Sequence, residues 1–189
     1  MTAADGDIVG RVRGGDREAF GLLVQRHQDR LFGLVMMMVR ERSGAEDVAQ
    51  DAFVRAYTHL ERYDVERPFY PWLAAIAVRL AQNWLRSRGR SIRREGAELD
   101  QAKEPSSPES ALGGLVADEQ RQQLWAAVST LAAGERAAVV LYYRDELAVR
   151  DIAAALGVSI GTIKTLLFRA RRHLRARLGA SILTGDSST

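Results

Sequence analysis

The sequence predicts an all-α protein in which two small helical domains are joined by a flexible linker. Apolar residues recur at helical spacing in both halves of the chain, and the regular alternation that marks β-strands does not occur. Between about Gly89 and Leu115 the helical periodicity is lost, and glycine, proline and serine become frequent. These observations predict a first domain over 7–90, a linker over 91–117 and a second domain over 118–178.

The first domain is expected to begin with one long amphipathic helix. Asp16 is a suitable N-cap, because a carboxylate accepts hydrogen bonds from the free amides of a first turn. Apolar residues then recur at helical spacing from Phe20 to Met38. The helix is expected to end near Ser43-Gly44.

Two further helices are expected in this domain. The second covers 45–60, with apolar residues on one side and acidic residues on its other faces. Pro68 and Pro71 then resist helix continuation, because proline lacks an amide hydrogen and restricts the residue before it. A third helix is expected over 72–88, where the apolar stripe resumes.

Charge is unevenly distributed, although the formal net charge is only +3. Arginines cluster between Arg86 and Arg94, the segment 95–118 is acidic, and 158–178 is basic without a single acid. Two basic patches on either side of an acidic strip indicate a polyanionic partner that is contacted at two places. The alternative is that these arginine-rich faces are only solvated.

The last two helices form the most informative pattern. A short helix over 149–155 is followed by a tight turn at Gly157, where glycine adopts a left-handed backbone most easily. Ser159 can cap the next helix through its hydroxyl. A helix, a glycine turn and a second helix with a polar and basic N-terminal face predict a DNA-binding helix-turn-helix. The stripe expected to be buried is Ile160, Ile163, Leu167, Ala170 and Leu174.

The second helix of this pair is expected to enter the major groove of duplex DNA. Lys164, Thr165 and Arg169 can reach base edges or phosphates. The arginines further along the helix suit phosphate contacts, which raise affinity without reading sequence. The residues expected to contact this DNA are Ser159, Thr162, Lys164, Thr165, Arg169, Arg171 and Arg172.

Four motifs occur in the order of a known family. GDREAF (15–20) resembles the start of its region 2, and AEDVAQDAFVRAY (45–57) resembles its polymerase-binding helix. FYPWLAAIA (69–77) resembles its promoter-melting segment, and GTIKTLLFRAR (161–171) resembles the recognition helix of its region 4. From about Asp7 to Leu178, the chain therefore resembles an extracytoplasmic-function (group IV) sigma factor of bacterial RNA polymerase.

The resemblance implies an alternative sigma factor that binds core RNA polymerase and directs promoter-specific transcription initiation. An acidic, partly amide face on the second helix suits a basic partner helix. From the residues alone, an ordinary solvated face is the competing interpretation. The residues implied in core-polymerase binding are Asp47, Gln50, Asp51 and Phe53.

The same resemblance implies that the aromatic loop after the second helix holds a base from the melted −10 strand. Aromatic rings and a guanidinium suit single strands, because every base has a face for stacking. For Phe69, Trp72 and Trp84 the alternative is core packing. The residues implied in −10 DNA binding are Tyr63, Asp64, Arg67, Phe69, Arg79, Asn83, Arg86 and Arg88.

The family also implies an anti-sigma factor that masks the polymerase-binding surfaces until a stress signal arrives. The acidic linker either threads the polymerase cleft or serves only as a tether. The sequence departs from the family at Arg79, where asparagine is usual, and at Leu166, where arginine is common. The −35 sequence that this chain reads is therefore expected to be atypical.

Other classes of protein explain the sequence less well. A stand-alone helix-turn-helix repressor accounts for 161–171 but not for the acidic helix or the aromatic loop. The three histidines have no metal-ligand spacing, and the chain has no cysteine. We therefore expect no enzyme, metal or cofactor. The longest apolar run, Leu31 to Val39, is short of the about 20 residues that span a bilayer, so a cytoplasmic protein without membrane insertion is expected.

Overall fold

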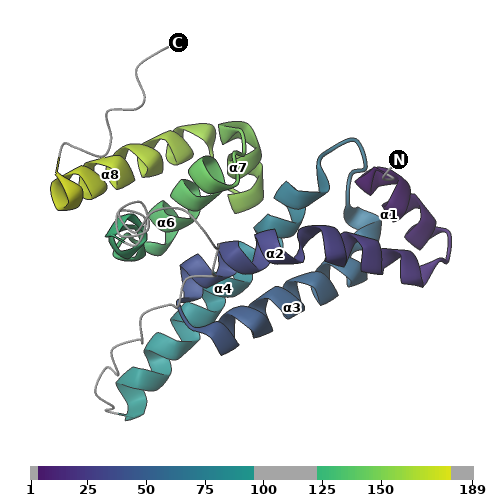
Figure 1. Ribbon diagram of the computed structural model, residues 1–189, viewed down its shortest axis with the longest axis horizontal. Coiled ribbons are helices and arrows are strands. Elements are labelled where there is room, and N and C mark those ends of the chain that lie inside the picture. The colour runs from purple at the N-terminus through teal and green to yellow at the C-terminus, as the bar shows by residue number, and fades with distance from the viewer. Residues whose placement is uncertain (1–3, 96–122, 180–189) are drawn as a thin grey trace, which may run out of the picture.

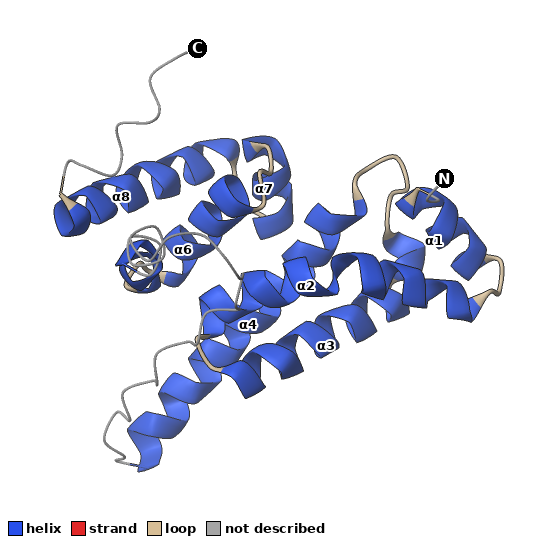
Figure 2. Ribbon diagram, viewed as in Figure 1, coloured by secondary structure: helices blue, strands red, loops and turns tan. Residues whose placement is uncertain are grey.

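The computed structural model describes residues 4–95 and 123–179, and no strand occurs among them (Figure 2). In the first domain, the three long helices α2, α3 and α4 pack against one another, with α1 at one end of the group (Figure 1). The elements of this domain are α1 (Asp5–Arg13), η1 (Arg17–Ala19), α2 (Phe20–Val39), α3 (Arg42–Thr58), η2 (Leu60–Arg62) and α4 (Phe69–Glu95).

The start of α2 follows the prediction and its end does not. Asp16 is a cap: its Oδ1 accepts from the backbone N–H of Ala19 at 3.2 Å, and it begins the short turn η1, which leads directly into α2. The helix ends at Val39 because Arg40 adopts a left-handed backbone with φ of 64°. The predicted end at Ser43-Gly44 is therefore wrong.

Gly44 has a packing role instead. It lies in α3, where a Cβ would come within 2.5 Å of Trp84 Cζ2 on α4. Glycine at this position lets α3 approach α4 closely. Trp84 therefore packs between the helices of this domain, and the core-packing alternative for Trp84 is confirmed.

Helix α4 is longer at both ends than the predicted 72–88. Pro71 lies in its first turn, where an amide hydrogen would have no intrahelical acceptor in any case. At the other end Gly89 does not stop the helix, which continues to Glu95. Residues 91–95 are thus helical, and the rest of the predicted linker lies outside the described residues.

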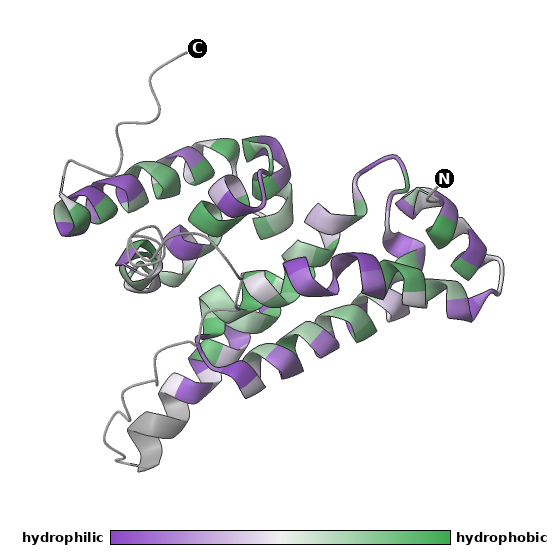
Figure 3. Ribbon diagram, viewed as in Figure 1, coloured by the Kyte–Doolittle hydropathy of each residue, from purple (hydrophilic) through white to green (hydrophobic). Residues whose placement is uncertain are grey.

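The second domain contains a helical segment at 123–129, α6 (Ala133–Val139), the π-helical turn η3 (Val140–Arg144), α7 (Val149–Leu156) and α8 (Ile160–Leu178). Helices α7 and α8 are bent by 104° about Gly157, within the range of helix-turn-helix motifs. Hydrophilic and hydrophobic residues alternate along α8 (Figure 3), as the amphipathic pattern predicts. No single helix in the described ranges is both long and apolar enough to cross a membrane.

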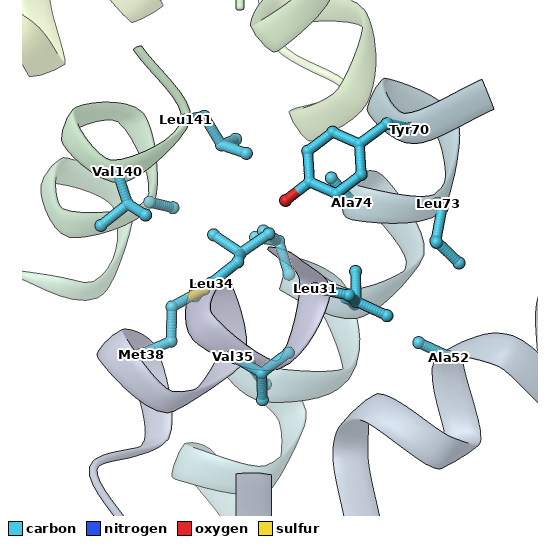
Figure 4. Close-up of a cluster of buried hydrophobic side chains, with 14 of the residues drawn as sticks. Leu31, Leu34, Val35, Met38, Ala52, Tyr70, Leu73, Ala74, Val140 and Leu141 are labelled. Carbon is cyan, nitrogen blue, oxygen red and sulfur yellow. The ribbon is translucent and has the colours of Figure 1, made fainter. Parts of the chain in front are cut away.

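One buried hydrophobic cluster extends through both domains. In its centre, Leu31, Leu34, Val35 and Met38 of α2 lie between α4 and η3 (Figure 4). Tyr70 and Ala74 reach them from α4, and Val140 and Leu141 reach them from η3. The two domains therefore pack on each other as well as each having its own core.

Candidate nucleic-acid interface and partner groove

The helix-turn-helix has the local geometry that its sequence predicts. Gly157 ends α7 with φ of +67°, a left-handed backbone that glycine adopts without strain. Ser159 caps α8, because its Oγ accepts from the backbone N–H of Thr162 at 3.1 Å. These two residues set the direction of α8 relative to α7.

The predicted buried stripe of α8 is confirmed for Ile163, Leu167, Ala170 and Leu174. Ile160 is the exception: as the first residue of the helix it is 49% exposed, so the buried stripe begins one turn later. Leu166 is half-buried and faces α6, where a Cβ on Gly134 would lie 3.8 Å from its Cδ2. Leu166 thus packs within the domain and does not replace a cation on the outer face.

The outer face of α8 is polar and basic around one exposed ring. Phe168 is 64% exposed and lies one turn after Lys164. The Thr165 hydroxyl donates to the Gly161 carbonyl at 2.9 Å. Thr162, Lys164, Thr165, Arg169 and Arg172, all predicted to contact DNA, are exposed together on this helix.

Arg171 differs from the other predicted DNA contacts. It is half-buried, and its Nε donates to the Tyr143 hydroxyl at 2.7 Å. Its guanidinium also lies 5.7 Å from the centre of the Tyr143 ring. Arg171 is therefore oriented by η3, and sequence reasoning did not identify Tyr143 as its partner.

A groove of about 660 Å³ lies between α2 and α3. Its apolar lining includes Phe20 and Tyr57, whose rings meet edge to face at 5.1 Å. Of the residues predicted to bind polymerase, Gln50 and Phe53 line the groove. Asp47 and Asp51 are exposed on α3 but do not line it.

The groove also contains residues that sequence reasoning missed. Val54, 57% exposed, and Tyr57 extend its apolar wall, and Asp29 and Glu46 add acidic groups. Val54 interrupts an otherwise polar face of α3, and this apolar residue was the feature of the sequence that could have indicated the groove. The acidic face and the apolar groove thus adjoin on α3.

The aromatic loop is packed from the inside. Phe69 is only 1% exposed, and its ring meets that of Tyr63 edge to face at 5.4 Å. Trp72 packs on both rings, with centroids 5.2 Å from Tyr63 and 5.6 Å from Phe69. Tyr63 and Phe69 are therefore core residues in this structure, and their role in −10 DNA binding stays a prediction.

The loop exposes other groups. Asp64 and Arg67 form an ion pair with 3.2 Å between Oδ2 and Nε, and both side chains are exposed. On the buried side of the loop, the Tyr63 hydroxyl donates to the Arg67 carbonyl. Burial, with a smaller effect from Asp5, raises the pKa of Tyr63 to about 12, so this hydroxyl remains a donor at neutral pH.

Helix α1 was not predicted, and it holds this loop. Arg13 Nη2 donates to the carbonyls of Leu60 and Tyr63 at 2.6 and 2.5 Å. The signal in the sequence was the acidic start and basic end of the segment, with Asp5 and Arg13 at suitable ends of the helix dipole.

The four residues predicted to follow the DNA backbone divide into two groups on α4. Arg79, Asn83 and Arg86 are exposed, and Arg86 Nη2 donates to Asn83 Oδ1 at 2.5 Å. Arg88 instead pairs with Glu41 and lies 5.1 Å from the Trp84 ring centre. The structure thus brings Arg79, Asn83 and Arg86 together and turns Arg88 toward the α2–α3 turn.

Family comparisons agree with this architecture. The family model for Sigma-70 region 2 matches residues 23–91, and that for Sigma-70 region 4 matches 121–174. The RNA polymerase sigma-H factor of Pseudomonas aeruginosa is 36% identical over 90% of this chain and 91% of its own length. The ECF RNA polymerase sigma-E factor of Escherichia coli is 36% identical over 88% of this chain and 90% of its own.

Solved structures with the same fold include two complexes, one of them between a sigma factor and an anti-sigma factor. The sigma factor RpoE of Bartonella quintana, in complex with the anti-sigma factor NepR, matches 87% of this chain and 99% of its own with a TM-score of 0.70 and 25% identity. CnrH, in complex with the cytosolic domain of CnrY, matches 95% of this chain and 99% of its own with a TM-score of 0.67 and 26% identity.

Fold and surface together define a two-domain helical protein with a helix-turn-helix in its second domain. With relatives covering about nine-tenths of its length, the chain belongs to the extracytoplasmic-function group of the sigma-70 family.

Proposed function

We propose that this protein is an alternative sigma factor that recruits core RNA polymerase to specific promoters. The first domain binds polymerase through the groove between α2 and α3 and the acidic face of α3. The second domain docks α8 in the major groove of the −35 element. The first domain then holds the melted −10 strand through exposed residues of the loop and α4, namely Asp64, Arg67, Arg79, Asn83 and Arg86.

The observation that carries this proposal is the pairing of two different surfaces in one chain. A capped α8 with an exposed basic face suits duplex DNA, where cations bind phosphates and side chains read base edges. An apolar groove beside Asp47 and Asp51 suits a basic partner helix with an apolar edge. A repressor needs the first surface but has no use for the second.

Regulation and location follow from the same assignment. The solved sigma factor RpoE bound to the anti-sigma factor NepR supports control of this chain by an anti-sigma factor. The chain contributes binding energy and leaves covalent chemistry to the polymerase, in the cytoplasm where that enzyme works. A stress signal releases the protein from the anti-sigma factor.

Asp47→Arg tests the polymerase surface. Asp47 is exposed on α3, so reversing its charge leaves the fold intact while placing a cation against a basic partner. We expect the variant to lose co-elution with sigma-free core polymerase on size exclusion. Glu18→Arg, an equal charge change at an exposed acid before α2, is the control and retains binding. Co-elution of Asp47→Arg at wild-type affinity contradicts the assignment.

A further inference from the structure

The two domains are joined by a buried polar contact that the proposed function does not use. The Tyr70 hydroxyl on α4 donates to Asp145 Oδ2, after η3, at 2.7 Å. Each residue is only 3% exposed. The contact spans 75 positions in sequence, from the first domain to the second.

Two arginines complete this contact from other elements. The Arg30 guanidinium of α2 stacks 3.8 Å from the centre of the Tyr70 ring and donates to the Asp145 carbonyl. Arg144 Nη1 lies 3.3 Å from Asp145 Oδ1 and donates to the Arg30 carbonyl at 3.2 Å. Arg144 lies directly over Gly33, where a Cβ would collide with its guanidinium. Asp145 is therefore surrounded by donors from α2, α4 and η3.

Burial of this cluster depends on the domain contact. Burial raises the pKa of Asp145, although Tyr70 and the two arginines oppose that effect. A carboxylate out of water is costly unless its partners are present, so separating the domains would solvate Asp145 and leave Tyr70 without this acceptor. The cluster belongs to the closed arrangement of the domains and to neither domain alone.

An apolar seam lies beside the polar cluster. Leu34 and Met38 of α2 face Val140 and Leu141 of η3, and all four are fully buried (Figure 4). At the end of α2, Arg136 Nη1 donates to the Met38 carbonyl at 2.8 Å. Apolar burial supplies the attraction between the domains, and the polar contacts select one orientation.

The closed arrangement places the second domain beside one proposed surface and leaves the other open. Helix α7 packs on α4, and a Cβ on Gly157 would lie 3.4 Å from Arg79 Nη2. The helix-turn-helix therefore stands beside the −10 face of α4. The groove between α2 and α3 is lined by Phe20 and Val24, on a different face of α2 from Gly33 and Leu34. The groove is therefore open to a partner, whereas a DNA strand that follows α4 past Arg79 would meet the helix-turn-helix.

We propose that Tyr70, Asp145 and Arg30 form a latch that holds the free protein in a closed, self-inhibited form. In this form the helix-turn-helix adjoins Arg79 and keeps a DNA strand from lying along the whole −10 face, while the polymerase groove stays accessible. Opening the latch moves the helix-turn-helix away from α4 and frees α8 to move toward the −35 element. The inhibitory meaning of the latch rests on the proposed function, whereas the latch itself is a conformational property of the chain.

Energy transfer between the two domains tests the latch directly. Because the sequence contains no cysteine, Glu18→Cys and Ala176→Cys place one donor and one acceptor dye on exposed positions of the two domains. We expect a dominant high-transfer population in the free protein. Tyr70→Phe removes the hydrogen bond, and Asp145→Asn removes the negative charge that Arg30 and Arg144 contact; both change the shape little. Each should raise the ratio of open to closed molecules about tenfold.

Two comparisons make this measurement specific. Since Tyr70 and Asp145 contact each other directly, the double variant should open little more than either single variant. Asp151→Asn neutralises an acid on α7 whose partner is the neighbouring Arg150, so it should leave energy transfer unchanged. Circular dichroism confirms that each variant stays folded.

A labelled short single-stranded DNA of random sequence reports on the −10 face. If only open molecules bind it, the latch variants bind more tightly by the same factor as their gain in open population. Unchanged energy transfer in both latch variants overturns the latch. Energy transfer that stays high after core polymerase is added also overturns it, because the domains then form one rigid unit that polymerase does not open. Opening without tighter strand binding overturns the inhibitory role. If the latch variants open as expected but the protein never directs transcription, the latch is confirmed and the proposed function is refuted.

Discussion

His27 shows how one side chain connects α1 to the core of the first domain. Its ring packs near Phe69 and Tyr70, with centroids 5.4 and 5.9 Å apart. With its proton on Nε2, the imidazole donates to Asp5 Oδ2 at 2.9 Å. This contact fixes the start of α1 against α2, and α1 in turn holds the loop through Arg13.

The protonation of His27 predicts a pH dependence of stability. Burial lowers the pKa of His27 below its usual 6.5, although Asp5 opposes the change. The unfolded chain therefore takes up this proton more readily, and stability present at neutral pH is lost as the pH falls through about 6.5. We expect the melting temperature to fall between about pH 7.5 and 5.5, and to fall less in His27→Gln.

Thermal unfolding across this pH range checks that expectation. His59→Gln is the matched control, because His59 is exposed and its Nδ1 bonds the backbone carbonyl of Arg55 in the preceding helix α3. The control should keep the wild-type slope. Equal slopes for wild type and His27→Gln would contradict the assignment of the proton to His27.

Residues with a strict local requirement could be identified from the sequence. Ser159 has the short hydroxyl that an N-cap needs, and Gly157 supplies the left-handed turn before it. Phe69 had no such signal, because a ring suits a base stack and a core equally well. Its position is decided by Tyr63, Trp72 and His27, which surround it in three dimensions.

At the scale of the element, substitutions at the N-cap of α8 are expected to change stability and DNA binding in different ways. Ser159→Ala removes the acceptor for the Thr162 amide and should cost about 1 kcal/mol of unfolding free energy. Ser159→Asp keeps an acceptor and should retain most of that stability, but it adds a negative charge at the end of α8 that enters the groove. Urea unfolding measures the first effect.

Binding to a −35 duplex measures the second effect. Ser159→Asp should bind more weakly than Ser159→Ala although it is the more stable protein. If the order of affinity follows the order of stability, α8 does not enter the groove by its N-terminal end.

Helix boundaries were harder to predict than the helices themselves. The apolar spacing predicted α2, α3, α4, α7 and α8. The break between α2 and α3 depends on Arg40, and arginine has no preference for the left-handed backbone that it adopts there. Gly44 resembled a terminator in sequence but is a contact point for Trp84. Both outcomes depend on tertiary packing, which local pattern does not contain.

For the whole molecule, α2 has two functional faces. One lines the polymerase groove through Phe20 and Val24. The other receives the second domain through Arg30 and Leu34. The sequence indicated two modules from the loss of periodicity between them, but nothing local links Tyr70 to Asp145. Their contact follows only once the two domains are placed together.

The central claim is that this protein gives polymerase its promoter specificity. The most direct test adds the purified protein to sigma-free bacterial core polymerase with genomic DNA fragments and maps the 5′ ends of the transcripts. The account predicts discrete start sites that share −35 and −10 elements, lost when the added protein carries Asp47→Arg. An absence of specific starts, with duplex binding intact in a gel shift, would contradict it and identify a repressor instead.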